Sequence, residues 1–263
     1  MPSEPGSRRI GLARALSKLG YCSRSQAADL IRAGLVRLNG TVRRDPELPV
    51  RLESDGIAVD GRKIEPRKRI YLMMNKPRGL VTTASDEKGR DTVYSILEKS
   101  PEPLPWVAPV GRLDKASEGL LLLSNDSEWG ARIAAPETHL DKTYHVQINT
   151  NAAEEIAQSL IRGVRSEDGE LLQAKRASLL RRGEKNCWLE IVLDEGKNRQ
   201  IRRMLAVLDV EVLRLVRIAI GPLMLGNLAK GEFRALTAEE KRALDRAMQT
   251  KSKSALTSAR SRG

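Results

Sequence analysis

An aspartate in a turn before an apolar strand is the first candidate for chemistry in this chain. In VGRLDKASEGLLLLSND, residues 110–126, Asp114 follows Arg112 by two positions and precedes the apolar run 119–124. A carboxylate held at the edge of a rigid strand can serve as a nucleophile or a base. A neighbouring cation would favour its ionised form. An isolated Arg-Leu-Asp is more often a solvated turn, so this motif alone does not establish a site.

A second candidate is a cationic stretch at the start of an expected helix. GKNRQIRR, residues 196–203, holds four cations and no acid: Lys197, Arg199, Arg202 and Arg203. Cations at a helix N-terminus oppose the helix dipole, and a bound anion would relieve that conflict. The glycine spacing and the Lys-Ser/Thr pair of a phosphate-binding loop are absent. The alternative interpretation is a solvated basic face.

The elements that position these groups fall into two parts. Helical spacing is predicted over 8–20 and 24–32, with Ser23 as the cap of the second helix, and short β elements follow around Asn39-Gly40 and Asp60-Gly61. This small module, residues 8–66, carries cations on the outer faces of its helix pair, where they can contact RNA phosphates. These cations are Arg14, Lys18, Arg24 and Arg32.

A basic hinge at 66–69 separates this module from a larger domain, residues 68–247. Strands are predicted at 70–74, 119–124, 143–148, 187–193 and 211–218, and helices at 152–162, 199–208 and 238–248. Because strands and helices mix without a βαβ rhythm, we expect an α+β fold with a mainly antiparallel, mixed sheet flanked by helices. Residues 248–263 are rich in Ser, Lys and Arg and are expected to form a disordered basic tail.

The composition indicates which classes of partner the chain can bind. The chain has 46 Lys and Arg against 34 Asp and Glu, a net charge of +12, which points to a polyanion such as nucleic acid. The two cysteines are too few for a disulfide framework and indicate a reducing, cytoplasmic compartment. With only two histidines as well, no Cys/His zinc cluster is expected. No apolar run is long enough for a membrane span, so no membrane partner is expected.

Together these motifs resemble the RsuA/RluB-type pseudouridine synthases. The sequence GRLDKASEGLLLLSND is similar to that family's signature, and Lys76-Pro77-Arg78-Gly79, Lys142-Thr143-Tyr144 and EGKNRQIRRM at 195–204 match its further motifs in order. The first sixty residues resemble an S4 RNA-binding domain. The chain departs from the pattern at Ala116-Ser117, where many members have a threonine-containing pair.

The resemblance implies roles for the candidate residues. It makes Asp114 the residue that attacks C1′ or deprotonates C2′ of the target ribose, and the sequence does not choose between these. It makes Tyr144 the ring on which the everted uracil stacks. Lys197, Arg199 and Arg112 are the candidate cations beside Asp114, and spacing does not decide among them. The reaction is an isomerisation, so no cofactor and no metal are expected.

The expected substrate is a uridine of ribosomal RNA or of a ribosomal precursor particle, with 23S favoured over 16S, and the expected state is a monomer. The alternative is a non-catalytic S4-type RNA-binding or ribosome assembly protein. A pure RNA binder has no need for an ionised carboxylate between cations, because that carboxylate would repel phosphate.

Overall fold

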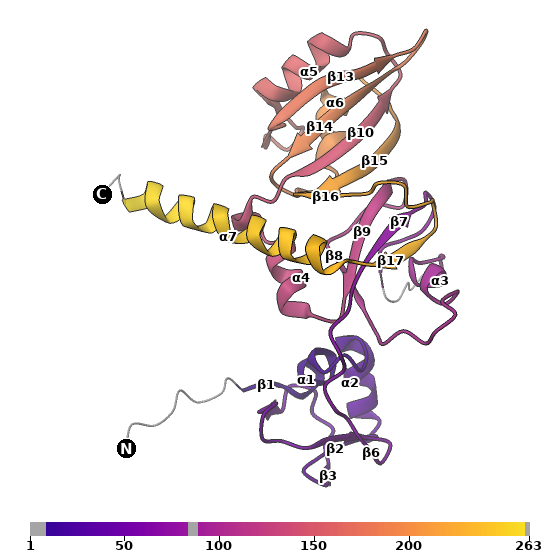
Figure 1. Cartoon of the computed structure of the whole chain (residues 1–263), viewed down its shortest axis with the longest axis vertical. Coiled ribbons are helices and arrows are strands. Elements are labelled where there is room, and N and C mark those ends of the chain that lie inside the picture. The colour runs from indigo at the N-terminus through magenta and orange to yellow at the C-terminus, as the bar shows by residue number, and fades with distance from the viewer. Residues whose placement is uncertain (1–8, 84–88, 261–263) are drawn as a thin grey trace. The chain divides into compact units, whose positions relative to one another are not determined.

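The computed structural model describes residues 9–83 and 89–260, and these form two compact units (Figure 1). The first unit comprises Met1–Tyr71, Ser100–Ala108 and Leu123–Ser127, and the second comprises Leu72–Lys99, Pro109–Leu122 and Glu128–Gly263. The sequence suggests one boundary near 66–69. The two short segments that return to the first unit, 100–108 and 123–127, are not visible from sequence order.

The first unit is built on two helices, α1 (Leu12–Lys18) and α2 (Arg24–Arg32). The predicted cap of α2 is confirmed. The backbone N–H of Gln26 donates to the Ser23 hydroxyl at 3.1 Å, and the backbone N–H of Ser23 donates to the Gln26 side chain at 3.0 Å. The predicted helix 8–20 is shorter than expected, because Ile10–Gly11 form strand β1 against β4 (Pro49–Val50).

A small sheet completes this unit. It runs β3 (Thr41–Val42), β2 (Val36–Leu38), β5 (Ile57–Val59) and β6 (Arg62–Lys63), and it is antiparallel. Asn39-Gly40 and Asp60-Gly61 all have positive φ, as the tight hairpin turns predicted there require. Leu12, Leu16 and Ile31 from the helices are fully buried in a shared core with Val36.

A nine-stranded sheet among the described residues dominates the second unit. In spatial order its main path is β13 (Arg176–Arg182), β14 (Cys187–Leu193), β10 (Lys142–Ile148), β15 (Val212–Ile220), β9 (Glu118–Ser124), β7 (Tyr71–Lys76) and β17 (Phe233–Ala235). The short strands β8 (Ala108–Val110) and β16 (Leu223–Met224) pair with β9 and β15. The β15–β9 pair is parallel, and β10 is antiparallel to both β14 and β15, so the expected α+β fold with a mixed, mainly antiparallel sheet is confirmed.

Helices α5 (Ala153–Arg162) and α6 (Gln200–Val207) pack on β14 and its neighbours (Figure 1). Leu160 of α5 and Met204 of α6 are fully buried in one cluster with Val146 and Leu189 of the sheet. This packing fixes the start of α6, which carries the basic stretch, against the strand that carries Tyr144. A hairpin of β11 (Val164–Arg165) and β12 (Leu171–Leu172) follows α5.

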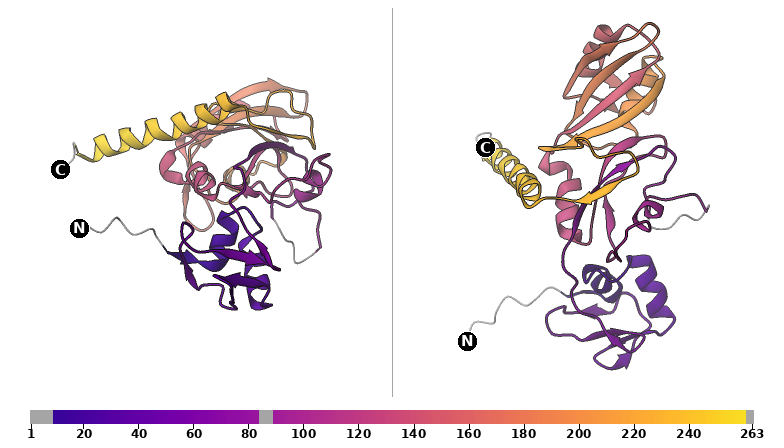
Figure 2. Two further views of the ribbon diagram at one scale, coloured as in Figure 1. Left: turned by 60° about the horizontal axis from the view of Figure 1, so that its bottom comes forward. Right: turned by 45° about the vertical axis from the view of Figure 1, so that its right-hand side comes forward.

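The remaining helices are α3 (Tyr94–Leu97), α4 (Ser127–Ala134), the 3-10 turn η1 (Pro136–Thr138) and α7 (Ala238–Arg260). Trp129 of α4 is fully buried and its indole N–H donates to Asp245 of α7 at 3.0 Å. In Figure 2, α7 (yellow) runs out beyond the sheet of its own unit. Within the described residues, no helix combines the length and the apolar character that a membrane span requires.

Most of the segment predicted as a basic tail from residue 248 lies in α7. The helix continues to Arg260, twelve residues past the predicted end at Met248. Residues 249–260 contain no glycine or proline, so no residue in this segment interrupts helical hydrogen bonding. The last part of the predicted tail, 261–263, lies outside the described residues.

Candidate active site

A cavity of about 310 Å³ in the second unit brings the predicted residues together. Its walls come from the turn 110–117, from β10, from the stretch 196–202 and from β15. Six predicted residues line it: Arg112, Asp114, Tyr144, Lys197, Arg199 and Arg202. Its volume lies at the small end of the range of roughly 300–1,000 Å³ for ligand sites, so it suits a single small group.

A buried lysine holds the turn that carries Asp114. Lys76, at the end of β7, is fully buried, and its ammonium donates to the carbonyls of Ser117 at 2.9 Å, Pro77 at 3.1 Å and Asp114 at 3.2 Å. Burial lowers the pKa of Lys76 to about 8, against the opposing effects of Asp114 and Glu118. The turn is thus tied to β7 by a cation beneath it.

Thr82 adds a second tie to the same turn. Its hydroxyl donates to the Leu113 carbonyl at 2.7 Å, next to Asp114. Lys76 begins the motif Lys76-Pro77-Arg78-Gly79 quoted above and Thr82 follows that motif, but sequence reasoning gave neither residue a role. The signal that could have found Lys76 is a lysine at the end of an apolar strand, since such a group must find acceptors when it is buried.

Arg199 is the cation that the structure places beside the Asp114 carboxylate. Its Nη1 lies 3.7 Å from Asp114 Oδ2, and the two side chains are 52% and 35% exposed. Arg199 caps α6 with φ +48, a left-handed conformation that non-glycine residues seldom adopt. Backbone strain of this kind is held by surrounding structure and is frequent at functional sites.

Arg202 adds a second guanidinium to the same wall. It donates to the Ala116 carbonyl at 3.2 Å, and its Nε is buried with no hydrogen-bond partner among the described residues. Burial lowers the pKa of Arg202, as do Arg199 and Arg78, while Asp114 opposes them. Four arginines line the cavity with one carboxylate, that of Asp114, so its described lining carries an excess of positive charge, which suits an anion.

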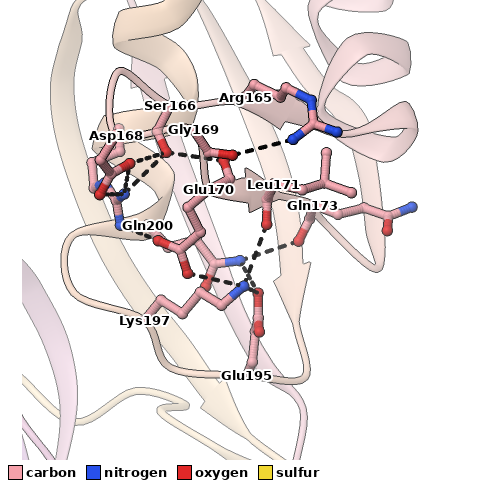
Figure 3. A network of polar contacts seen from close by, with 11 residues as sticks. Arg165, Ser166, Asp168, Gly169, Glu170, Leu171, Gln173, Glu195, Lys197 and Gln200 are labelled. Carbon is pink, nitrogen blue, oxygen red and sulfur yellow. Dashed lines mark hydrogen bonds and ion pairs between the residues drawn. The ribbon is translucent and has the colours of Figure 1, made fainter.

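Lys197 lines the cavity, but its ammonium pairs with acids away from Asp114. It lies 3.3 Å from Glu170 and 3.2 Å from Glu195 (Figure 3). Burial lowers the pKa of Lys197, but hydrogen bonds to Glu195 and Glu170 outweigh it, so the net shift is upward. Of the three cations that the sequence left open, Arg199 therefore has the ion pair with Asp114.

Arg203 belongs to the same network and does not line the cavity. Its guanidinium donates to Asp168 and to Glu170, each at 2.9 Å. The acids come from the β11–β12 hairpin, which the sequence analysis did not connect with the basic stretch. The stretch 196–203 itself contains no acid, but the hairpin supplies acids that pair with two of its four cations, Lys197 and Arg203.

Tyr144 and Arg217 lie opposite each other on neighbouring strands. Tyr144 of β10 pairs in register with Arg217 of β15, and both line the cavity. Arg217 is 6% exposed, and sequence reasoning missed it. Its sequence context, an arginine in an apolar strand, is a signal of the same kind as that of Lys76.

The four cations predicted for RNA contact in the first unit do not line the cavity. Arg14, Arg24 and Arg32 are exposed and Lys18 is half-buried, and Arg32 pairs with Asp29 at 3.2 Å. Cys22 and Cys187 are buried and not disulfide-bonded. Among the residues described here, no three His, Cys, Asp or Glu side chains gather as metal ligands.

Comparison with known proteins agrees with this geometry. Residues 70–207 match the family described as RNA pseudouridylate synthase, and residues 10–57 match the S4 domain. The chain is 36% identical over 231 residues to ribosomal large subunit pseudouridine synthase B of Bacillus subtilis (strain 168), covering 87% of this chain and 93% of that protein. It is 35% identical over 232 residues to an RNA pseudouridine synthase of Aquifex aeolicus (strain VF5), covering 88% and 92%.

A solved structure gives the same result. The crystal structure of a pseudouridylate synthase matches with a TM-score of 0.62 at 30% identity, covering 89% of this chain and 99% of that one. A protein that only binds RNA has no use for a synthase domain, so the alternative of a non-catalytic assembly protein is not supported. The chain is a member of the RNA pseudouridine synthase family, of the type with an N-terminal S4 domain.

Proposed function

We propose that this enzyme isomerises a uridine of ribosomal RNA to pseudouridine, with Asp114 as the catalytic carboxylate. The observation that carries the proposal is the position of Asp114 in a small cavity, 3.7 Å from the permanent cation of Arg199 and together with the ring of Tyr144. We further propose 23S RNA as the substrate, on the basis of the relative named for the large ribosomal subunit.

The cavity admits a single nucleotide for each reaction. An everted uridine enters the cavity and its uracil stacks on Tyr144. Asp114 either attacks C1′ or removes the proton from C2′, and the C1′–N1 bond breaks with its electron pair moving to the uracil. The base turns and C5 bonds to C1′. At that step the Asp114–C1′ bond breaks in the first route, and C2′ regains its proton from Asp114 in the second. C5 then loses its proton and N1 gains one. Both routes use the Asp114 carboxylate, and the guanidinium of Arg199 lies 3.7 Å from it.

The excess cations of the cavity wall account for the approach of the substrate. Arg199 and Arg202 at the start of α6 face an anionic backbone with backbone N–H groups beside them. The exposed cations of the S4 domain add sequence-independent affinity that falls with salt concentration. We therefore assign binding to phosphate contacts over both units and chemistry to the cavity of the second.

The test is to incubate the enzyme with transcripts of 23S and 16S RNA and map pseudouridine by carbodiimide labelling and primer extension. Wild type should modify a single site or a few sites in 23S RNA. Asp114→Asn keeps the volume and removes the charge, so it should abolish product while RNA affinity stays within about threefold. Turnover near wild type in Asp114→Asn would refute the role of Asp114, and modification of 16S RNA alone would refute the 23S assignment.

A further inference from the structure

Arg217 is a buried cation of the cavity to which the proposed reaction gives no task. It is 6% exposed and lines the cavity from β15. Its Nε donates to the Leu120 carbonyl at 2.8 Å, while Nη2 is buried and has no hydrogen-bond partner among the described residues. A guanidinium stays charged at any accessible pH, and buried donors without acceptors are costly. The substrate is the natural source of the missing acceptor.

The strand register fixes where this donor stands. Arg217 pairs with Tyr144 on one side and with Gly119 on the other. Because side chains at facing positions of paired strands lie on the same face, the guanidinium stands beside the Tyr144 ring. A β-carbon on Gly119 would clash with the Arg217 backbone, so β9 and β15 approach each other more closely here than a larger residue would allow. The position of Arg217 is therefore rigidly set relative to the Asp114 turn, which leads into β9.

A base carbonyl suits this donor better than a phosphate does. The excess cations that suit phosphate, Arg199 and Arg202, lie at the start of α6, and Arg199 is half-exposed. Arg217 instead lies in the sheet beside the proposed stacking ring, where the edge of a stacked uracil would lie. Uracil presents two carbonyl oxygens in its ring plane, and a planar guanidinium donates well to such acceptors.

We propose that Arg217 binds a carbonyl oxygen of the everted uracil, an inference that rests on the proposed function above. When the C1′–N1 bond breaks, its electron pair spreads over the uracil ring to both carbonyl oxygens. A fixed N–H donor at one of them stabilises that charge as it develops and holds the free base while it turns. Since the interaction strengthens in the transition state, its loss lowers the rate of the chemical step more than RNA affinity.

The test compares Arg217→Met and Arg217→Lys with wild type in single-turnover reactions at saturating enzyme, on the mapped target RNA. Arg217→Met should lower the rate by about 100-fold, as the loss of one preorganised donor does elsewhere. Arg217→Lys keeps a donor and should be less impaired. The Kd for RNA should change less than about threefold in both. Arg181→Gln, which removes an exposed cation of the same sheet that does not line the cavity, should react like wild type.

If Arg217 had only a structural role, it would act through its hydrogen bond to Leu120 and would not sense the uracil carbonyls. Target RNAs with 2-thiouridine or 4-thiouridine separate the two roles, because they change only those carbonyls. Sulfur is a weaker acceptor than oxygen, so at the bound carbonyl it should slow wild type and have no further effect in Arg217→Met. An equal thio effect in both enzymes at both positions, or an unimpaired Arg217→Met, overturns the inference while the proposed function stands. Failure of wild type and Arg181→Gln to modify any ribosomal RNA overturns both proposals.

Discussion

Replacing Lys76 by methionine tests how the active-site turn is held. The ammonium of Lys76 donates to three carbonyls, among them that of Asp114, and the side chain is fully buried. Methionine has a similar length and no charge, so Lys76→Met leaves three acceptors without this donor. The turn should loosen, and both stability and turnover should fall at neutral pH.

The pH dependence of the free energy of unfolding gives a more specific test of the buried lysine. The pKa of Lys76 is lowered from 10.5 to about 8 in the folded protein, so between these values the unfolded chain binds more protons than the folded one. Stability must then rise with pH over this window, because the buried charge is lost at lower pH in the folded state than in the unfolded state. From pH 7.5 to pH 10 the contribution amounts to about 2 kcal/mol, and Lys76→Met lacks it.

The assay is urea unfolding followed by tryptophan fluorescence between pH 7 and pH 10, for wild type and for Lys76→Met. The free energy of unfolding of wild type minus that of the variant should grow with pH by the stated amount. Lys115→Met removes an exposed lysine of the same turn and should show no such trend relative to wild type. A difference that is flat or falls with pH would refute the idea of a buried, charged lysine beneath Asp114.

Three further outcomes follow from contacts in the second unit. In urea unfolding, Glu118→Gln should cost about 1–3 kcal/mol, because it removes the charged acceptor of Arg214 and Lys230, whose side chains are about half exposed and keep part of their hydration. Burial raises the pKa of Glu118, but Arg214 and Lys230 lower it by more, so the net shift is downward. Wild type, unlike the variant, should therefore lose stability as the pH falls below 4.5. In urea unfolding, Gly119→Ala should cost more than about 4 kcal/mol through strain and a backbone clash, whereas Gly111→Ala, with open space and φ +73, should cost only about 1–3 kcal/mol. Arg199→Met should lower single-turnover rates by about 100-fold and Lys197→Met, which only weakens the anchoring of the entry to α6, by less than about tenfold; equal effects would contradict the pairing described here.

Local signals in the sequence predicted most elements well. The helix 24–32 and the strand 187–193 have the predicted bounds, and Ser23 caps the helix as expected. Among the elements that were not predicted, two have identifiable reasons. Strand β13 carries charges on both faces and so lacks an apolar alternation, and α4 contains Gly130, which lowers helix propensity but lets Val110 pack closely against it.

The sequence predicted several residues that share the cavity, but not their pairings. Asp114, Tyr144 and Arg199 come from separate segments, and a motif states their order but not their distances. The parallel pairing of β15 with β9 joins Arg217 to Gly119, far apart in the sequence, and it is this pairing that places Arg217 in the cavity. Sequence patterns reflect local periodicity, whereas such a register depends on how the whole sheet assembles.

Because of the acidic β11–β12 hairpin, the basic stretch 196–203 both anchors the start of α6 and supplies cations to the cavity. Asp168 and Glu170 bind Arg203, and Glu170 with Glu195 binds Lys197, so these cations fix the entry to α6. That anchoring lets Arg199 hold a left-handed backbone, since a strained residue persists only where its surroundings determine its conformation.

The consequence is a division of charge along a single segment. Arg199 and Arg202 line the cavity and carry positive charge beside Asp114. Lys197 and Arg203 instead form ion pairs with acids of the hairpin. Without the hairpin acids, four adjacent cations would repel one another and would compete for the Asp114 carboxylate. The acids of a neighbouring hairpin therefore select which arginine stands next to Asp114, and a sequence motif that shows only the cations leaves this choice open.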